Sequence, residues 1–145
     1  MQLNKYIKLS ILSLQKSNKR KELKRIFIYL LADCIKMQSI NKRFNKDDRI
    51  WLYSDPREAQ KKAYQYLGRG VLLFRSEVKS KKYSVVDPLT NKTINFGQMG
   101  YRDWTHPKNT DEKRRASYLA RSENIRGNWK ANKYSPNNLS RNILW

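Results

Sequence analysis

The feature that most limits what this chain can fold into is its charge. Lys and Arg total 32 against 12 Asp and Glu, which gives a formal net charge of +20 in 145 residues. A compact domain with such an excess repels itself. We therefore expect a partner that neutralises it: nucleic acid, an anionic membrane face or an acidic protein surface. Because 12% of the residues are aromatic, part of the chain should still form a folded core rather than a disordered tail.

The length allows one domain with an added arm. We predict a basic helical arm and linker over residues 1–50, and a small α+β domain with a C-terminal extension over residues 51–145. The longest apolar run, Ile26 to Ile35, is interrupted by Asp33 and is shorter than the roughly 20 residues that a membrane-spanning helix needs. The single cysteine, Cys34, excludes an intrachain disulfide, and we interpret it as a small buried side chain.

The first 21 residues contain six bases and no acid, and their apolar residues recur at helical spacing. We interpret this stretch as a basic amphipathic helix. Such an arm can lie on a membrane, a nucleic acid or a neighbouring subunit, or it can pack on its own domain. Its bases are candidate partner-binding residues: Lys5, Lys8, Lys16, Lys19, Arg20 and Lys21.

Two further helices are expected before the sheet. The first spans residues 22–37 and has an apolar stripe wide enough to be buried on more than one side. Residues 39–48 are interpreted as a polar loop. The next helix starts near Asp55, because Ser54 or Asp55 can cap it and a following proline suits the first turn. Two glycines at positions 68 and 70 then end it.

Short apolar runs at residues 71–74, 83–86 and 93–96 predict three antiparallel strands, and residues 87–92 have the composition of a hairpin turn. A basic helix follows from about residue 110 to 121, and residues 135–139 can form one last helical turn. The fold class is therefore α+β: N-terminal helices, a small three-stranded antiparallel sheet covered by a helix, a basic C-terminal helix and an extended aromatic tail.

Signatures of catalysis are nearly absent. The sequence has no nucleophile elbow and no glycine-rich phosphate loop, and it has one histidine, His106. A nuclease that uses Asp103, His106 and Asp111 around a metal is the enzymatic alternative. We predict that the chain is not an enzyme, with no catalytic residue, metal site or cofactor.

Bases and aromatic residues alternate in the last third of the chain. Arginines of the basic helix can pair phosphate or carboxylate in two-point fashion, or can simply form a solvated face. The aromatic residues suit stacking on single-stranded bases or anchoring in a protein interface, and we favour an anchor docked in a neighbour for the last of them. The candidate partner-binding residues here are Arg114, Arg115, Arg121, Trp129, Tyr134 and Trp145.

Several unusual blocks resemble a family of small basic proteins of nucleocytoplasmic large DNA viruses (giant viruses). They are KKYSV at 81–85, FGQMGYRDWTH at 96–106, DEKRRASYLAR at 111–121, GNWK at 127–130 and YSPNNLSRNILW at 134–145. The resemblance extends over about residues 55–145. The residues that carry it include Phe96, Gly97, Gly100, Tyr101, Asp103, Thr105, His106, Tyr118, Pro136 and Leu139.

The resemblance implies a virion assembled in the host cytoplasm. We expect a minor capsid protein, acting as cement or scaffold beneath an icosahedral shell. Its partners would be the major capsid protein, other minor capsid proteins and an internal membrane surface touched by the N-terminal arm. The alternative is a nucleic-acid-binding protein for genome packaging or a ribosome-like assembly.

Overall fold

The computed structural model describes residues 23, 26–28, 31, 40 and 42–145. The chain divides into two compact units, Met1–Ser39 and Ile40–Trp145. The helix expected at the start of the arm lies outside the described residues, together with its six candidate bases. All elements labelled below belong to the second unit.

The centre of this unit is a three-stranded antiparallel sheet in the order β1-β2-β3: β1 (Phe74–Arg75), β2 (Lys81–Val86) and β3 (Thr93–Gln98). In the register of β2 and β3, Tyr83 lies opposite Phe96, and both side chains are buried. The turn between these strands is closed by a hydrogen bond from the Asp87 amide to the Lys92 carbonyl, 2.9 Å long. The α+β fold class and the hairpin are thus confirmed.

The helix expected after Ser54 is α3 (Pro56–Leu67). The Asp55 side chain accepts a hydrogen bond from the Arg57 amide, and the proline occupies the first turn. Gly68, at φ 111°, ends the helix because a left-handed φ favours glycine. Ala59 and Ala63 are fully buried on the face that packs onto the core.

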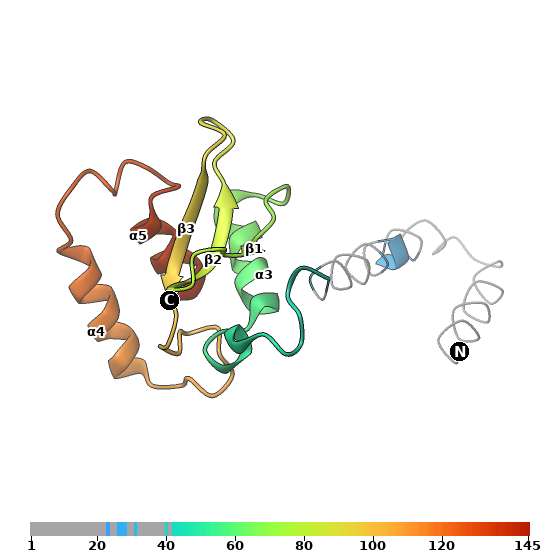
Figure 1. Ribbon diagram of the computed structural model, residues 1–145, viewed down its shortest axis with the longest axis horizontal. Helices are drawn as coiled ribbons and strands as arrows, with labels where there is room; N and C mark the ends of the chain where they lie inside the picture. The colour runs from blue at the N-terminus through green and yellow to red at the C-terminus, as the bar shows by residue number, and fades with distance from the viewer. Residues whose placement is uncertain (1–22, 24–25, 29–30, 32–39, 41) are drawn as a thin grey trace. The chain divides into compact units, whose positions relative to one another are not determined.

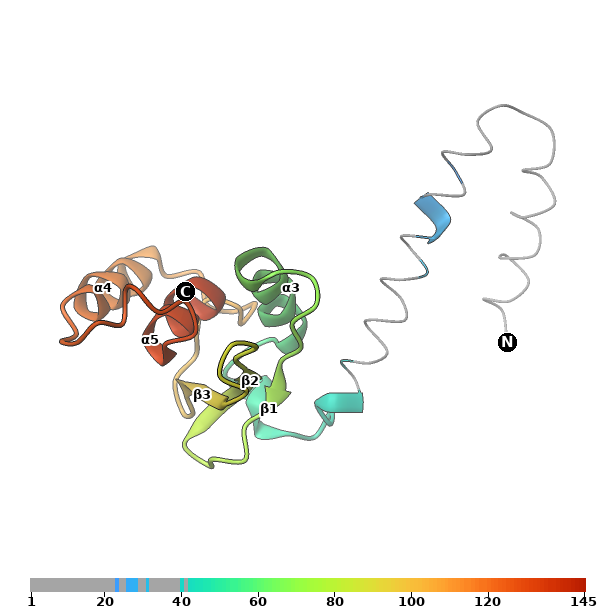
Figure 2. The same ribbon diagram turned by 90° about the horizontal axis from the view of Figure 1, so that it is seen from above.

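A second helix on the sheet comes from the end of the chain. α5 (Pro136–Leu139) begins at Ser135, whose side chain accepts from the Asn138 amide, and it continues without a break into a π-helical turn, η3 (Ser140–Leu144). We call Pro136–Leu144 the C-terminal helix. Figure 2 shows α3 and α5 on the same side of the sheet. The predicted last helical turn is confirmed, and the structure extends it to Leu144.

The basic helix is α4 (Glu112–Glu123), capped by the Asp111 side chain, which accepts from the Arg114 amide. It lies on the β3 side of the sheet (Figure 1). Ser122 is the one buried residue of its twelve. A helix this exposed is stabilised by its cap and a few specific contacts rather than by a broad apolar face.

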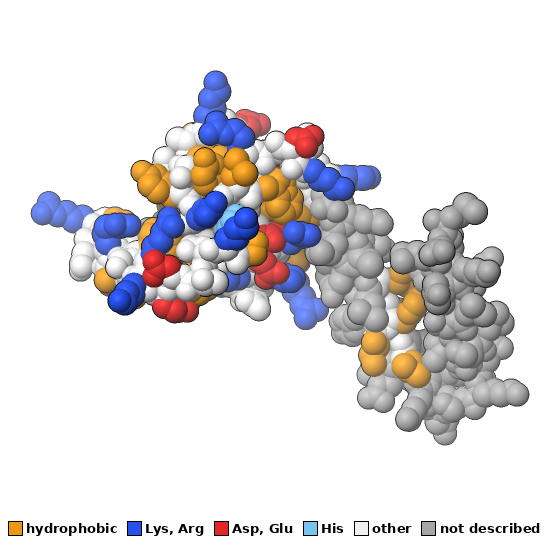
Figure 3. Space-filling model, turned by 90° about the horizontal axis from the view of Figure 1, so that it is seen from below, with side chains coloured by type: hydrophobic (Ala, Val, Ile, Leu, Met, Phe, Trp, Pro, Cys, Tyr) orange, Lys and Arg blue, Asp and Glu red, His pale blue; other side chains and the backbone are white. Residues whose placement is uncertain are grey.

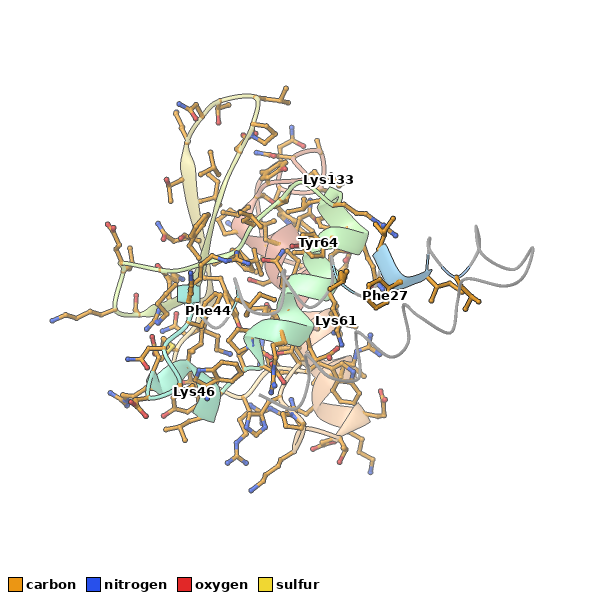
Figure 4. All side chains as sticks on the ribbon, turned by 90° about the vertical axis from the view of Figure 1, so that its right-hand side faces the viewer. Phe27, Phe44, Lys46, Lys61, Tyr64 and Lys133 are labelled. Atoms are coloured by element: carbon orange, nitrogen blue, oxygen red, sulfur yellow. The ribbon has the colours of Figure 1, made fainter. Side chains whose placement is uncertain are left out.

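The expectation of a polar loop over residues 39–48 is wrong. Phe44 (labelled in Figure 4) and Ile40 are buried, and the ring of Phe44 meets that of Tyr83 edge-on at a centroid distance of 5.6 Å. The described residues 40, 42 and 43 are helical, so the two apolar side chains share one helix face four residues apart. The compact unit therefore starts at Ile40 rather than at residue 51. A short 3-10 helix, η2 (Arg49–Leu52), follows.

The first predicted strand is also misplaced. Residues 71–73 are not in the sheet, and Leu72 is exposed. The buried side chain of Gln60, rather than a neighbouring strand, forms hydrogen bonds with the backbone here. Its Oε1 accepts from the Leu73 amide at 2.9 Å, and its Nε2 donates to the Val71 carbonyl at 2.9 Å. Only Phe74 and Arg75 then pair with β2.

The helix predicted over residues 22–37 can be compared at five positions. Leu23, Ile26–Ile28 and Leu31 are helical. Four of these side chains are exposed and Phe27 is half-buried, so the wide apolar stripe is not buried on more than one side at the described positions.

Gly97 packs closely against the C-terminal helix. Its φ is 75°, and a Cβ at this position would lie 2.6 Å from Leu144 Cδ1. Gly97→Ala is expected to lower the free energy of unfolding by about 2–4 kcal/mol, because backbone strain and overpacking add. Gly70→Ala is the control, since nothing lies within 4 Å of its Cβ position. Urea denaturation of the full chain measures both, and equal effects would contradict the close packing of Gly97 against the C-terminal helix.

Candidate functional site

α4 does not lie flat on the rest of the unit. Between α4, β3 and the C-terminal helix is a cavity of about 440 Å³, which we call the α4 groove. None of the residues that line it is acidic. They are Arg114, Ser117, Tyr118 and Arg121 of α4, Lys82, Gly97, Gln98 and Tyr101 of the sheet and the turn after it, and Ser140, Leu144 and Trp145 at the end of the chain.

The α4 wall of the groove follows from helical periodicity. Arg114, Tyr118 and Arg121 are four and three residues apart, so they share one face of the helix over two turns. Ser117 lies between them on the same face. One helix therefore presents two guanidinium groups, a hydroxyl and a phenol to the cavity.

An aromatic stack holds these arginines. The rings of Tyr118 and Trp145 are parallel within 11° at a centroid distance of 4.3 Å. The guanidinium of Arg114 lies 5.9 Å from the Trp145 centroid, and that of Arg121 lies 6.0 Å from the Tyr118 centroid. A guanidinium over a ring is attracted to its face, and its N–H groups still point outward in its own plane. The stack thus orients two planar donors for carboxylate or phosphate oxygens.

Each end of α4 is fixed to the C-terminal segment. Near its start, Arg115 Nε donates to the main-chain oxygen of Trp145 at 2.7 Å. Near its end, Arg141 donates to the Leu119 carbonyl and to Ser122 Oγ, each at 2.5 Å, and forms an ion pair with Glu123 at 2.8 Å. These contacts hold the helix across the groove, and between them Tyr118 and Leu119 are half-buried against the core.

The sheet side of the groove rests on a buried ion pair. Lys82 Nζ lies 2.7 Å from Asp103 Oδ2, and the two side chains are 2% and 1% exposed. The amine also donates to the carbonyls of Tyr101 at 2.6 Å and Tyr53 at 3.4 Å, so all three of its N–H groups have partners. Burial lowers the pKa of the Lys82 amine, and the carboxylate of Asp103 opposes this shift.

A buried hydrogen-bond network continues from this pair. Asp103 Oδ1 accepts from the Thr105 amide at 3.0 Å and from its hydroxyl at 2.6 Å. Thr105 Oγ1 in turn lies 2.9 Å from Ser54 Oγ, to which the Tyr83 hydroxyl donates at 2.7 Å. The network joins the turn after β3 to the start of α3 and to β2. Asp103 and Thr105 of the FGQMGYRDWTH block are therefore positioning residues for the groove.

The charge of the unit remains strongly positive after its ion pairs are counted. Residues 40–145 contain 23 Lys and Arg and 10 Asp and Glu, a balance of +13. Six of those acids are already paired with bases of the same unit. Figure 3 shows Lys and Arg side chains spread over the face seen from below, around the pale-blue His106. Few carboxylates of the unit are therefore left to compete with an acidic partner for its remaining bases.

The tryptophan rings are covered by the protein's own cations. Arg57 lies 5.2 Å from the Trp51 centroid, Arg115 lies 5.1 Å from that of Trp104, and Lys130 and Arg141 each lie 5.5 Å from that of Trp129. Trp145 is covered by Tyr118 and Arg114. Stacking on bases requires open ring faces. Guanidinium edges are thus better exposed to a partner than tryptophan faces are.

The enzymatic alternative finds no supporting geometry among the described residues. Asp103 is bound to Lys82, and Asp111 caps α4. His106 Nδ1 accepts from the Lys108 amide at 3.2 Å. Burial, and to a smaller extent the nearby positive charge of Arg102, lowers the pKa of the His106 imidazole. Within the described part of the chain, no group of three His, Cys, Asp or Glu side chains is placed to hold a metal ion.

The structure brings some predicted site residues together and separates others. Arg114 and Arg121 line the groove with Gly97, Tyr101, Tyr118 and Trp145. Arg115 faces Trp104 and Trp145 instead. Trp129 and Tyr134 lie elsewhere: the Trp129 indole donates to the Ile125 carbonyl at 2.7 Å, and Tyr134 packs at the edge of the core. Of the other resemblance residues, Phe96 and Leu139 are core, Pro136 starts α5 and Gly100 has φ 89°.

The expectation that the Trp145 ring docks in a neighbour needs correction. The residue is 8% exposed, because its ring is stacked inside its own unit. Five groove residues were not predicted as site residues. Ser117 was detectable from its helical spacing to Arg114 and Arg121, whereas the others join the site only through tertiary packing: Lys82, Gln98, Ser140 and Leu144.

Comparison with known proteins adds one match. A family model described as a family of unknown function (DUF5754) matches residues 71–122, from the segment before β1 through most of α4. No curated protein and no solved structure matches the chain. Among the residues that the structure describes, no helix is both long and apolar enough to cross a membrane.

Proposed function

We propose that this chain is a minor capsid protein: a non-enzymatic structural protein of a virion that uses the α4 groove to hold an acidic surface of a neighbouring capsid protein. The observation that carries the proposal is the groove itself. Two arginines lie over aromatic rings, and no acid lines the cavity. Carboxylates are the protein groups that such planar donors pair best.

Three further features support this role. The +13 balance of the unit favours an anionic environment, as a crowded assembly with acidic surfaces provides. The buried Lys82–Asp103 pair fixes the sheet side of the groove, as suits a structural protein. The resemblance over residues 55–145 to small proteins of giant viruses suggests a virion as the setting.

Cross-linking in purified particles tests the proposal. Lys113 is exposed and next to Arg114, so an amine-reactive cross-linker should join it to lysines of a capsid protein. We expect mass spectrometry to find more such links at Lys113 than at Lys92, which is also exposed but lies at the hairpin turn. Absence of the chain from the particles, or links confined to Lys92, would contradict the proposal.

Nucleic-acid binding is the second candidate, and the spread of basic side chains beyond the groove favours it (Figure 3). If the chain neutralises about ten phosphates, the logarithm of its affinity for duplex DNA falls with the logarithm of salt concentration with a slope near −9. Filter binding between low and high salt measures that slope. An affinity that barely changes would eliminate this candidate.

A further inference from the structure

Ser117 occupies the middle of the α4 wall and has no part in the stack or in the attachments of the helix. Its side chain lines the groove, and the residue is exposed. Arg114 lies three residues before it and Arg121 four residues after it on the same helix face. At these separations side chains on a helix are neighbours, so both guanidinium groups can reach a charge placed on Ser117.

The residues before Ser117 form a recognisable acceptor pattern. Arg114 and Arg115 stand three and two positions before the hydroxyl, and Tyr118 follows it. Protein kinases that select basic substrates read such arginines with acidic pockets, through paired guanidinium–carboxylate contacts. Across the whole sequence no other serine has arginine at both positions. Ser84 has lysines there, but it is buried in β2.

A kinase needs the acceptor segment in an extended form, and α4 is suited to open locally. Its first ten residues include no fully buried side chain, Tyr118 and Leu119 are half-buried against the core, and its start is attached mainly through Arg115 and the Tyr118–Trp145 stack. Segments with few buried apolar contacts open at low free energy. Ser84 has no such access, since its strand is paired on both sides.

We propose that Ser117 is a phosphorylation site for a Ser/Thr kinase that selects basic substrates, and that its phosphate closes the α4 groove to acidic partners. In the reaction the Ser117 Oγ attacks the γ-phosphorus of ATP, a new O–P bond forms, ADP leaves, and the hydroxyl proton passes to the catalytic base of the kinase. The regulatory half of this proposal rests on the proposed function of the groove.

The effect of the phosphate follows from its charge. Phosphoserine carries about −1.5 to −2 charges at neutral pH and three strong acceptor oxygens. It would pair with Arg114 and Arg121, the same groups that bind a partner's carboxylates. The modified residue is thus an internal competitor at the centre of the site, and the partner must also approach a group of its own sign.

The test uses the full chain, MgATP and the catalytic subunit of cyclic-AMP-dependent protein kinase. We expect mass spectrometry to find one phosphate on Ser117, none on Ser84, and none at this site in Ser117→Ala. Fluorescence titration with polyglutamate then compares the two forms. We expect affinity to fall about ten-fold or more on phosphorylation, as two charge-assisted contacts are lost.

Each outcome separates the two proposals. If the unmodified chain binds polyglutamate but Ser117 accepts no phosphate, the modification site is wrong and the proposed function stands. If Ser117 is phosphorylated and affinity does not change, the regulatory half is overturned. If Ser117 is phosphorylated but neither form binds polyglutamate, the proposed function fails and with it the switch, while the modification site is supported.

Discussion

Lys82→Met is expected to lower the free energy of unfolding by about 3–5 kcal/mol, because it leaves the Asp103 carboxylate buried without its cation. Methionine nearly preserves the shape of the lysine stem, so the loss reports the charge rather than a cavity. Asp103 would keep its two hydrogen bonds from Thr105, but these cannot replace the neutralising amine. The carbonyls of Tyr53 and Tyr101 would lose a donor as well.

Urea denaturation of the full chain measures this effect. Lys61→Met is the matched control, since it makes the same chemical change in the surface pair with Glu58, whose side chains are 61% and 47% exposed. Exposed pairs contribute about 0–1 kcal/mol, so the control should change little. A Lys82→Met loss no larger than that of Lys61→Met would show that the buried pair does not hold the sheet side of the groove.

The double variant Arg114→Glu/Arg121→Glu is expected to weaken binding of an acidic peptide about 100-fold or more. Each reversal replaces a charge-assisted contact with repulsion, and truncating one such contact alone costs about 2–5 kcal/mol when it is desolvated. Fluorescence titration of the full chain with polyglutamate gives the two dissociation constants. Circular dichroism of the variant checks that α4 remains helical without its cation–π contacts.

The control for this variant is Arg69→Glu/Lys92→Glu. Two reversals of two units each lower the net charge from +20 to +16 in both proteins. Arg69 and Lys92 are exposed and do not line the groove. We expect the control to bind within about three-fold of the unmodified chain, because distant surface charges are screened at physiological salt. Equal losses would mean that binding follows net charge and needs no groove.

Elements with strong local signals were predictable from the sequence. The Asp55–Pro56 start and Gly68 end of α3, the hairpin between β2 and β3, and the cap of α4 all depend on residues within a few positions. The core residues Ile40 and Phe44 were missed because polar neighbours conceal their spacing. β1 was misplaced because the side chain of Gln60, distant in sequence, satisfies the backbone there.

The candidate site, like the fold, was predictable from the sequence only in part. Its α4 wall follows from the spacing of Arg114, Tyr118 and Arg121. The opposite wall depends on the pairing of Lys82 with Asp103, 21 positions later, and on the return of the chain's last residues to α4. Periodicity carries no information about such contacts. Trp145 was therefore expected in a neighbour, although its ring has a partner in its own unit.

We propose above all that the α4 groove binds acidic protein surfaces. The most direct measurement is an NMR titration of the ¹⁵N-labelled full chain with polyglutamate at physiological salt. We expect the largest shifts at the Gln98 and Ser117 amides, at the Arg114 and Arg121 side chains and at the Trp145 indole, with little change at Arg69 and Lys92. Shifts spread evenly over the basic surface, or confined to residues outside the groove, would contradict the claim.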